Sequence, residues 1–174
     1  MSQLGRAFTV RAADIDETPE VGEAPRDYVA RLALAKATRA RQDPREVVVA
    51  ADTTVDVDDT ILAKPADRQD ARQMLQLLSG RSHFVHTGVA LMWESGVEVI
   101  VVTSRVDFAE LCDADVDWYL ATGEGDDKAG AYALQGRAAR FVRGVAGSVS
   151  NIIGLPMYDL IELARRNGVP LLGD

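Results

Sequence analysis

The strongest constraint on how this chain folds is a pair of long apolar runs separated by one short turn. Residues 82–93 and 97–107 flank the turn Glu94-Ser95-Gly96. Two strand-length runs joined by a short, Gly-containing turn are typical of a β-hairpin. The sequence therefore predicts a long hairpin near the middle of the chain.

Helical patterns are interleaved with the strands. Pro25 and nearby carboxylates fit the start of a helix, and Asp43-Pro44 ends that helix after Gln42. Asp67 can cap a second helix, with Gly80 at its C-terminal end. The apolar face of this second helix has the spacing i, i+3, i+4, i+7 and consists of Ala71, Met74, Leu75 and Leu78.

The remaining patterns complete an alternation of strands and helices. They are a strand at residues 8–10, a strand buried on both faces at 47–51, a hairpin of Val55/Val57 and Ile61-Leu62 around Asp58-Asp59, a short helix capped by Asp113, a strand at 141–145 and a closing helix at 155–166. Strands that alternate with helices and are interrupted by hairpins predict an α/β protein with a mixed sheet.

The composition limits the class of protein. A chain of 174 residues with 47% hydrophobic residues fits one domain with a single apolar core. The net charge of −8 argues against a nucleic-acid partner, which requires a basic surface. No apolar run approaches the ~18 residues of a membrane span, and the single cysteine, Cys112, cannot form an internal disulfide. We therefore expect a cytoplasmic protein without membrane or nucleic-acid partners.

Lys36 is the most informative polar residue. In the first predicted helix it projects from the middle of an apolar stripe, which is formed by Val29, Leu32, Ala33 and Ala40. An ammonium group in such a place must extend to solvent or meet an anion, because an unpaired buried charge is costly. The spacing leaves both interpretations open.

Asp52 follows the predicted strand at residues 47–51. Ligands of α/β sheets collect outside the carboxyl ends of strands, where a carboxylate can bind a cation or activate water. The same position also suits an aspartate that only caps the next turn. Position alone favours neither interpretation.

Three further segments are weaker candidates. Lys64 and the run Asp126-Asp127-Lys128 are ordinary surface charges when each is considered alone. The glycine-rich residues 144–148 suggest a phosphate loop, but they lack the lysine of a P-loop and do not lead directly into a predicted helix.

Other kinds of site are excluded. His83 and His86 lie three residues apart on a predicted strand, so they point to opposite faces and cannot chelate one metal ion together. Cys112 has no evident His partner, and no serine stands in the sequence context of a serine-hydrolase nucleophile. The remaining carboxylates, lysines and glycine-rich turns suit metal-assisted attack of water on a phosphate ester or anhydride.

A series of motifs runs in order through essentially the whole chain. It comprises residues 14–17, 28–37, 51–53, 64–65, 74–88, 123–124, 127–132, 135–136 and 154–156. The most specific motifs are Leu78-Ser79-Gly80-x-x-His83 and Asp127-Lys128-Ala129-Gly130-Ala131-Tyr132. Together they resemble the Maf-like nucleotide pyrophosphatases, the "septum formation inhibitor Maf" family.

This resemblance implies an ITPase-like α/β fold, with a mixed sheet flanked by helices and a cleft between two lobes. It also implies hydrolysis of nucleoside triphosphates to the monophosphate and pyrophosphate with Mg²⁺ or Mn²⁺. The Ala-Asp-Thr and Gln-Gly motifs are similar to those of the branch that acts on dTTP, UTP and modified pyrimidine nucleotides. The implied partner is the nucleotide substrate, and a homodimer is compatible with the resemblance.

The resemblance also implies roles for four charged residues. Glu17 and Asp52 match the acidic active-site residues of the family; both would hold the divalent metal, and Asp52 would also activate water. Lys36 and Lys64 match its active-site lysines, which would neutralise the triphosphate.

Three more residues are expected at the substrate. Gln135 matches a pocket glutamine of the family, whose amide suits the edge of a uracil or thymine ring. Thr53 and Lys128 are expected to lie in a second layer around the substrate, next to the residues that bind it directly.

The start of the chain departs from the family pattern. Family members open with a strand and an Ala-Ser-x-Ser-Pro-Arg-Arg-type loop that grips phosphates, whereas residues 1–5 align with the end of the first family helix. We therefore expect one Maf-like domain, residues 1–174, that lacks these elements. Two alternatives follow: a catalytically impaired, nucleotide-binding homologue that regulates cell division, or an active enzyme whose true start lies upstream.

Overall fold

The structure, a computed structural model, describes residues 5–172. A sheet with the strand order β2-β1-β3-β4-β5 forms its centre, and all neighbouring strands pair antiparallel. The strands are β1 (Val48–Val57), β2 (Thr60–Leu62), β3 (Ser82–Trp93), β4 (Gly96–Phe108) and β5 (Val142–Ala146). The helices are α1 (Pro25–Ala40), α2 (Arg68–Leu78), α3 (Asp113–Leu120), α4 (Val149–Ile153) and α5 (Met157–Arg166), with the 3₁₀ turns η2 (Ala129–Ala131) and η3 (Arg137–Phe141). The predicted α/β class is confirmed.

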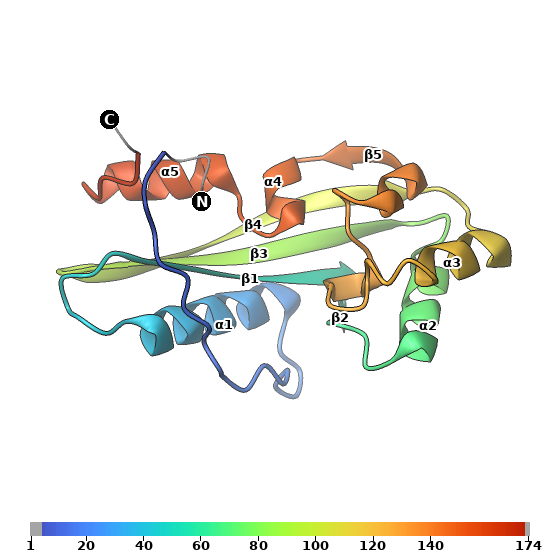
Figure 1. Cartoon of the computed structure of the whole chain (residues 1–174), viewed down its shortest axis with the longest axis horizontal. Helices are drawn as coiled ribbons and strands as arrows, with labels where there is room; N and C mark the ends of the chain where they lie inside the picture. Colours follow the sequence, from blue (N-terminus) through green and yellow to red (C-terminus); the bar gives the residue numbers. More distant parts are fainter. Residues whose placement is uncertain (1–4, 173–174) are drawn as a thin grey trace.

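Helices cover both faces of the sheet. α1 packs on one face, whereas α4 and α5 lie on the other, and α2 and α3 pack at one end (Figure 1). The apolar layer beneath α1 contains Ala33, Ala37, Ala90 and Met92. The layer beneath α5 contains Val89, Leu91, Leu160, Leu163 and Ala164. Across residues 5–172, none of the helices is both long and apolar enough to cross a bilayer.

The predicted long hairpin is confirmed. β3 begins and ends at the predicted residues, and β4 extends the predicted strand by one residue at each end. Ser82 lies opposite Asp107, and Trp93 lies opposite Gly96. The two strands therefore pair over their whole length and form the centre of the sheet.

The first two helices also confirm their sequence signals. α1 begins at Pro25, as predicted, and ends at Ala40 with Arg41 as its C-cap, slightly before the expected end at about Gln42. Asp67 caps α2 by accepting a hydrogen bond from the Asp70 N–H at 2.8 Å. Gly80 follows α2 with a φ of +69°, a left-handed conformation that glycine adopts at little cost.

Two strand predictions are wrong. Residues 8–10 are exposed and pair with none of the described strands, because extended residues form a strand only where a partner strand runs beside them. β1 does not end at Ala51, since its pairing with β3 continues to Asp56 and the strand itself to Val57. Asp52 therefore lies within a strand and not at its exit.

Three smaller expectations are corrected as well. The expected mixed sheet is antiparallel over the described residues, because tight turns join β1 to β2 and β3 to β4. Cys112, not Asp113, is the N-cap of α3, where its N–H bonds to Asp115 Oδ2 at 3.3 Å. α4 was not predicted, because its five residues are too few to show a helical period. Residues 144–148 therefore lead directly into a helix.

Candidate active site

Four charged side chains form one cluster where α1 meets the sheet. Lys36 Nζ lies 2.6 Å from Glu17 Oε1 and 2.5 Å from Asp52 Oδ1. Lys64 Nζ lies 3.6 Å from the second oxygen of Glu17. We call Glu17, Lys36, Asp52 and Lys64 the ion cluster. It contains all four charged residues expected in the active site, and Lys36 meets anions in it instead of extending to solvent.

Close packing of α1 on β3 brings Lys36 to Asp52. The backbone carbonyl of Val29 presses against Gly88, where an added Cβ would lie 2.2 Å from that oxygen. Gly88 stands opposite Asp52 in the register of β1 and β3. The missing side chain at Gly88 therefore lets α1 approach the sheet at the level of Asp52.

The same helix holds the loop that carries Glu17. The Tyr28 hydroxyl donates to the backbone carbonyl of Glu17 at 2.8 Å. Arg31 donates to the Glu23 carboxylate at 2.6 Å. Because Tyr28, Arg31 and Lys36 all belong to α1, one helix positions both the carboxylate and the ammonium group.

The ion cluster shifts the pKa values of its members in different directions. Burial raises the pKa of the Asp52 carboxyl, and the hydrogen bond from Lys36 offsets this only in part. The hydrogen bond from Lys36 lowers the pKa of Glu17. Burial alone would lower the pKa of Lys36, but its bonds to Asp52 and Glu17 outweigh burial and leave that pKa raised. Asp52 is therefore the better proton acceptor of the two carboxylates.

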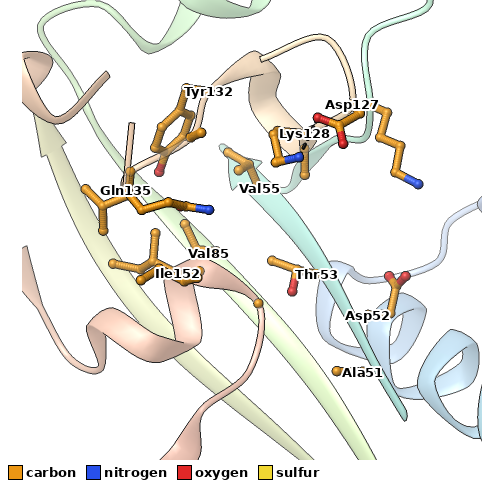
Figure 2. A pocket seen from close by; sticks show the side chains of 16 residues that line it. Ala51, Asp52, Thr53, Val55, Val85, Asp127, Lys128, Tyr132, Gln135 and Ile152 are labelled. Atoms are coloured by element: carbon orange, nitrogen blue, oxygen red, sulfur yellow. Dashed lines mark hydrogen bonds and ion pairs between the residues drawn. The ribbon is translucent and has the colours of Figure 1, made fainter. Parts of the chain in front are cut away.

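A pocket of about 190 Å³ opens beside the ion cluster. Asp52 lies at one end of it, and Gln135 and Tyr132 lie at the other (Figure 2). Its apolar lining includes Val55, Val85, Tyr132, Leu134 and Ile152, and its polar lining comprises Asp52, Thr53, Lys64, Asp127, Lys128 and Gln135. The pocket thus combines an apolar end with a charged end.

The pocket brings together the remaining expected residues. Thr53, Lys128 and Gln135 all line it. Asp52 and Lys64 belong to both the pocket and the ion cluster, which connects the two. Lys128 pairs with the neighbouring Asp127, so part of its charge is already neutralised (Figure 2).

Sequence reasoning missed a buried polar network next to the pocket. Thr87 Oγ1 lies 2.8 Å from Thr53 Oγ1 and donates to the backbone carbonyl of Asn151 at 2.9 Å. The Asn151 side chain donates to the backbone carbonyl of Val85 at 3.0 Å. Thr87 and Asn151 are 64 residues apart, and no local pattern connects them. Only the tertiary fold shows this network.

A carboxylate that was not assigned a role holds the turn of Gln135. Glu124 Oε2 accepts the Arg137 backbone N–H at 2.6 Å. A Cβ at Gly136 would lie 2.2 Å from the same oxygen. Gly136 therefore leaves room for the Glu124 carboxylate in the position that it has here.

The glycine-rich residues 144–148 serve the fold rather than the pocket. The backbone N–H of Ser148 donates to Ser104 Oγ at 3.0 Å. Ser148 Oγ in turn accepts the Asn151 backbone N–H at 3.2 Å and caps α4. The N–H and hydroxyl of Ser148, which a phosphate loop would present, are thus already bonded within the protein.

The carboxylates of the ion cluster fit a divalent cation that binds together with phosphate. Within residues 5–172, no group of three or more His, Cys, Asp or Glu side chains is arranged to hold a metal ion. Glu17 and Asp52 nevertheless converge on one point, since both contact the same nitrogen of Lys36. Mg²⁺ is commonly held by one or two carboxylates plus substrate phosphates. Glu17 and Asp52 are therefore the carboxylate ligands that the protein would contribute to such a site.

Comparisons with known proteins place this geometry in context. The family model described as "Maf-like protein" matches residues 1–167. The chain is 52% identical over 175 residues to the dTTP/UTP pyrophosphatase of Anaeromyxobacter dehalogenans (strain 2CP-C), which covers 98% of this chain and 89% of the relative. It is 49% identical over 172 residues to the dTTP/UTP pyrophosphatase of Myxococcus xanthus (strain DK1622), with 98% and 87% covered. It is 51% identical over 163 residues to the dTTP/UTP pyrophosphatase of Sphingopyxis alaskensis (strain DSM 13593 / LMG 18877 / RB2256), with 93% and 86% covered.

Proposed function

This chain belongs to the Maf-like protein family, and from that premise we propose that it hydrolyses dTTP and UTP to the nucleoside monophosphate and pyrophosphate. The observation that carries the proposal is the ion cluster, with Lys36 between Glu17 and Asp52, next to a pocket that ends at Gln135. We also treat the chain as one Maf-like domain, which the match over residues 1–167 supports.

The pocket suits a pyrimidine nucleoside. Val55, Val85 and Tyr132 supply apolar surface for a planar base, and the Gln135 amide offers both a donor and an acceptor to its edge. The volume of about 190 Å³ lies below the ~300–1,000 Å³ of pockets that enclose a whole ligand. We therefore place the base and sugar inside and the triphosphate at the open end, toward Lys64, which is 61% exposed.

Asp52 accepts the proton of the water that attacks the α-phosphorus. Its raised pKa makes it a stronger base than an ordinary aspartate, and Lys36 fixes the orientation of its carboxylate. The attack breaks the bond from the α-phosphorus to the bridging oxygen, so pyrophosphate leaves and the nucleoside monophosphate remains. Lys64 neutralises charge on the departing pyrophosphate.

Glu17 and Asp52 are the residues that would hold a divalent cation. When bound there, the cation supplies further neutralisation of the triphosphate charge. The lowered pKa of Glu17 keeps its carboxylate ionised at neutral pH and ready to serve as a ligand.

Measurement of pyrophosphate release tests the proposal. The purified chain is incubated with dTTP, UTP, CTP or ATP in Mg²⁺ or Mn²⁺, and dTTP and UTP are expected to be the preferred substrates. Asp52→Asn is expected to lower kcat by about 10²- to 10⁴-fold, because it removes the proton acceptor. Asp58→Asn is the matched control, since Asp58 lies in the β1–β2 turn with its side chain 77% exposed.

Each outcome has a distinct meaning. Equal turnover by the wild type and Asp52→Asn would exclude Asp52 as the base. A folded wild type that binds dTTP but releases no pyrophosphate would favour a nucleotide-binding homologue without catalysis. If it neither binds nor hydrolyses any of the four nucleotides, the proposed function is wrong.

A further inference from the structure

Two hydrogen bonds hold the backbone on either side of Gln135. The Ala133 N–H donates to the Tyr119 hydroxyl at 3.0 Å in a buried bond. The Arg137 N–H donates to Glu124 Oε2 at 2.6 Å. Ala133 and Arg137 stand two residues before and two residues after Gln135. The backbone that carries the Gln135 side chain is therefore fixed on both sides.

Both acceptors come from one short segment, residues 119–125, which we call the anchor segment. Tyr119 is the next-to-last residue of α3, it is 1% exposed, and its ring packs edge-on against Phe141 with 5.5 Å between the ring centroids. The Thr122 hydroxyl donates to the Tyr119 carbonyl at 2.7 Å and accepts the Glu124 N–H at 3.2 Å. Thr122 thus fixes the two anchoring residues relative to each other, and α3 attaches both to the core.

The loop before Gln135 needs support from outside itself. Ala131 has a φ of +58°, a left-handed conformation that residues other than glycine rarely adopt. Such a conformation persists only where the surrounding structure imposes it. The anchor segment lies directly against this point, because a Cβ at Gly125 would lie 2.1 Å from the Ala131 carbonyl oxygen. The loop therefore depends on the anchor segment for its shape.

The Gln135 amide takes its position from this backbone. Gln135 lines the pocket at the end opposite Asp52 (Figure 2). None of residues 5–172 forms a hydrogen bond with the Gln135 side chain, so its donor and its acceptor are both free for a ligand. A shift of the backbone at Ala133 or Arg137 would therefore move the amide relative to the bound base.

We propose that Tyr119 and Glu124 are positioning residues that act through Gln135 on the binding of the pyrimidine base. The inference rests on the proposed function, in which Gln135 contacts the edge of the base. Neither Tyr119 nor Glu124 lines the pocket, so both act on the nucleotide only through the loop. The ion cluster lies on α1, on β1 and on the loops that carry Glu17 and Lys64, so the chemical step is independent of the anchor segment.

Steady-state kinetics with dTTP and Mg²⁺ test this inference in a double-mutant cycle. Tyr119→Phe removes only the hydroxyl that holds Ala133. It is expected to raise KM by about 2- to 10-fold, the size of one hydrogen bond to the base, and to leave kcat near the wild-type value. In the Gln135→Ala background the same change is expected to leave KM unaltered, because the group through which Tyr119 acts is gone.

Glu124 supplies a matched pair of variants. Glu124→Ala removes the acceptor for the Arg137 N–H and is expected to behave like Tyr119→Phe. Glu124→Gln keeps a side-chain oxygen as the acceptor and is expected to keep the wild-type KM. Tyr158→Phe is the control for loss of a tyrosine hydroxyl, because Tyr158 is 74% exposed on α5 and lies outside the pocket.

Two further measurements separate positioning of Gln135 from a general loss of structure. Inorganic triphosphate has no base, so its inhibition constant is expected to be the same in the wild type, Tyr119→Phe and Glu124→Ala. Thermal melts show which variants fold. Glu124→Ala, whose side chain is 30% exposed in the wild type, decides the question if Tyr119→Phe does not fold.

The results separate this inference from the proposed function. A rise in KM that is equally large with and without the Gln135 side chain would overturn the inference while dTTP hydrolysis stands, as would an unchanged KM in the folded Tyr119→Phe and Glu124→Ala. If Gln135→Ala alone leaves KM unchanged, Gln135 does not contact the base and the inference is overturned. A folded wild type that neither binds nor hydrolyses dTTP would contradict the proposed function, and this inference with it.

Discussion

Lys36 and Asp52 stabilise each other at a buried position, where either charge alone would lower the stability of the fold. Their side chains are only 18% and 9% exposed, and a buried charge loses its hydration unless a partner replaces it. Removing Lys36 would leave the Asp52 carboxylate without its cation, whereas removing Asp52 would leave Lys36 paired with Glu17 alone. A nucleotide phosphate near Lys36 would compete for the same ammonium group, so substrate binding and the protonation of Asp52 are coupled.

His83 makes a separate prediction about stability. It is 1% exposed, its Nε2 lies 2.9 Å from the Tyr132 hydroxyl, and burial lowers its pKa to about 4 from the ordinary 6.5. A lowered pKa means that the unfolded chain takes up a proton below about pH 6.5 that the folded chain refuses. The contribution of uncharged His83 to the free energy of unfolding is therefore fully present above about pH 6.5 and is lost as the pH falls toward 4.

Urea unfolding of the wild type and of His83→Gln measures this loss. Between about pH 7 and about pH 4 the free energy of unfolding of the wild type should fall by about 3 kcal/mol more than that of the variant. His86 is unchanged in both proteins, so its own proton uptake cancels. Parallel pH profiles would show that His83 does not titrate in this way.

Secondary-structure elements were predictable where local chemistry specifies them. The Asp67 cap, Gly80 and the turn around Ser95 mark ends that need no distant partner. The predictions failed where partners decide: residues 8–10 lack a neighbouring strand within residues 5–172, and α4 depends on the bonds of Asn151 to β3 and β4.

The candidate site was also predictable only in part. The helical period alone placed Lys36 on the buried face of α1, whereas the family motifs suggested Glu17, Asp52, Lys64 and Gln135. Neither kind of signal reveals the pairing of Thr53 with Thr87, because it depends on the register of β1 against β3.

Gly88→Ala tests how α1 is seated on the sheet. The new Cβ would lie 2.2 Å from the Val29 carbonyl, so α1 must move away and carry Lys36 from Asp52. Overpacking of this kind typically lowers stability by about 1–3 kcal/mol. We expect such a loss in urea unfolding, together with a large fall in pyrophosphate release by the folded variant.

Gly144→Ala is the matched control, because a Cβ there would meet only Asp107 Oδ2, at 3.4 Å, in a strand outside the pocket. It should keep nearly all of its activity. If Gly88→Ala folds with undiminished turnover, close packing of α1 is not what positions Lys36.

A groove lies at the outer edge of β1. β2 pairs with only three residues of β1, beginning at Val55, so residues 48–54 have no partner strand on that side within the described chain. Residues 6–11 cross this edge (Figure 1), and together with residues 47–49 they line a groove of about 670 Å³. Arg11 ties the segment down through two 2.7 Å bonds to Glu46 and a 3.1 Å bond to the Ala40 carbonyl.

Arg11→Ala should therefore release residues 6–11 from the sheet edge at residues 47–49. The hydrogen bond from Arg11 lowers the pKa of Glu46 to about 2, so the ion pair persists through the neutral and mildly acidic range. In the variant, amide hydrogen exchange is expected to accelerate at residues 6–12 and at residues 47–49. Arg45→Ala is the control, because the Arg45 side chain is 79% exposed and pairs with Asp43 away from the groove.

The exposed edge should also change how the molecules associate. An unpaired strand edge is a template for pairing with another chain. Sedimentation should therefore show stronger self-association for Arg11→Ala than for the wild type or Arg45→Ala. Equal exchange and equal association in all three proteins would mean that Arg11 does not hold the segment, and that protection of the β1 edge comes from elsewhere in the molecule.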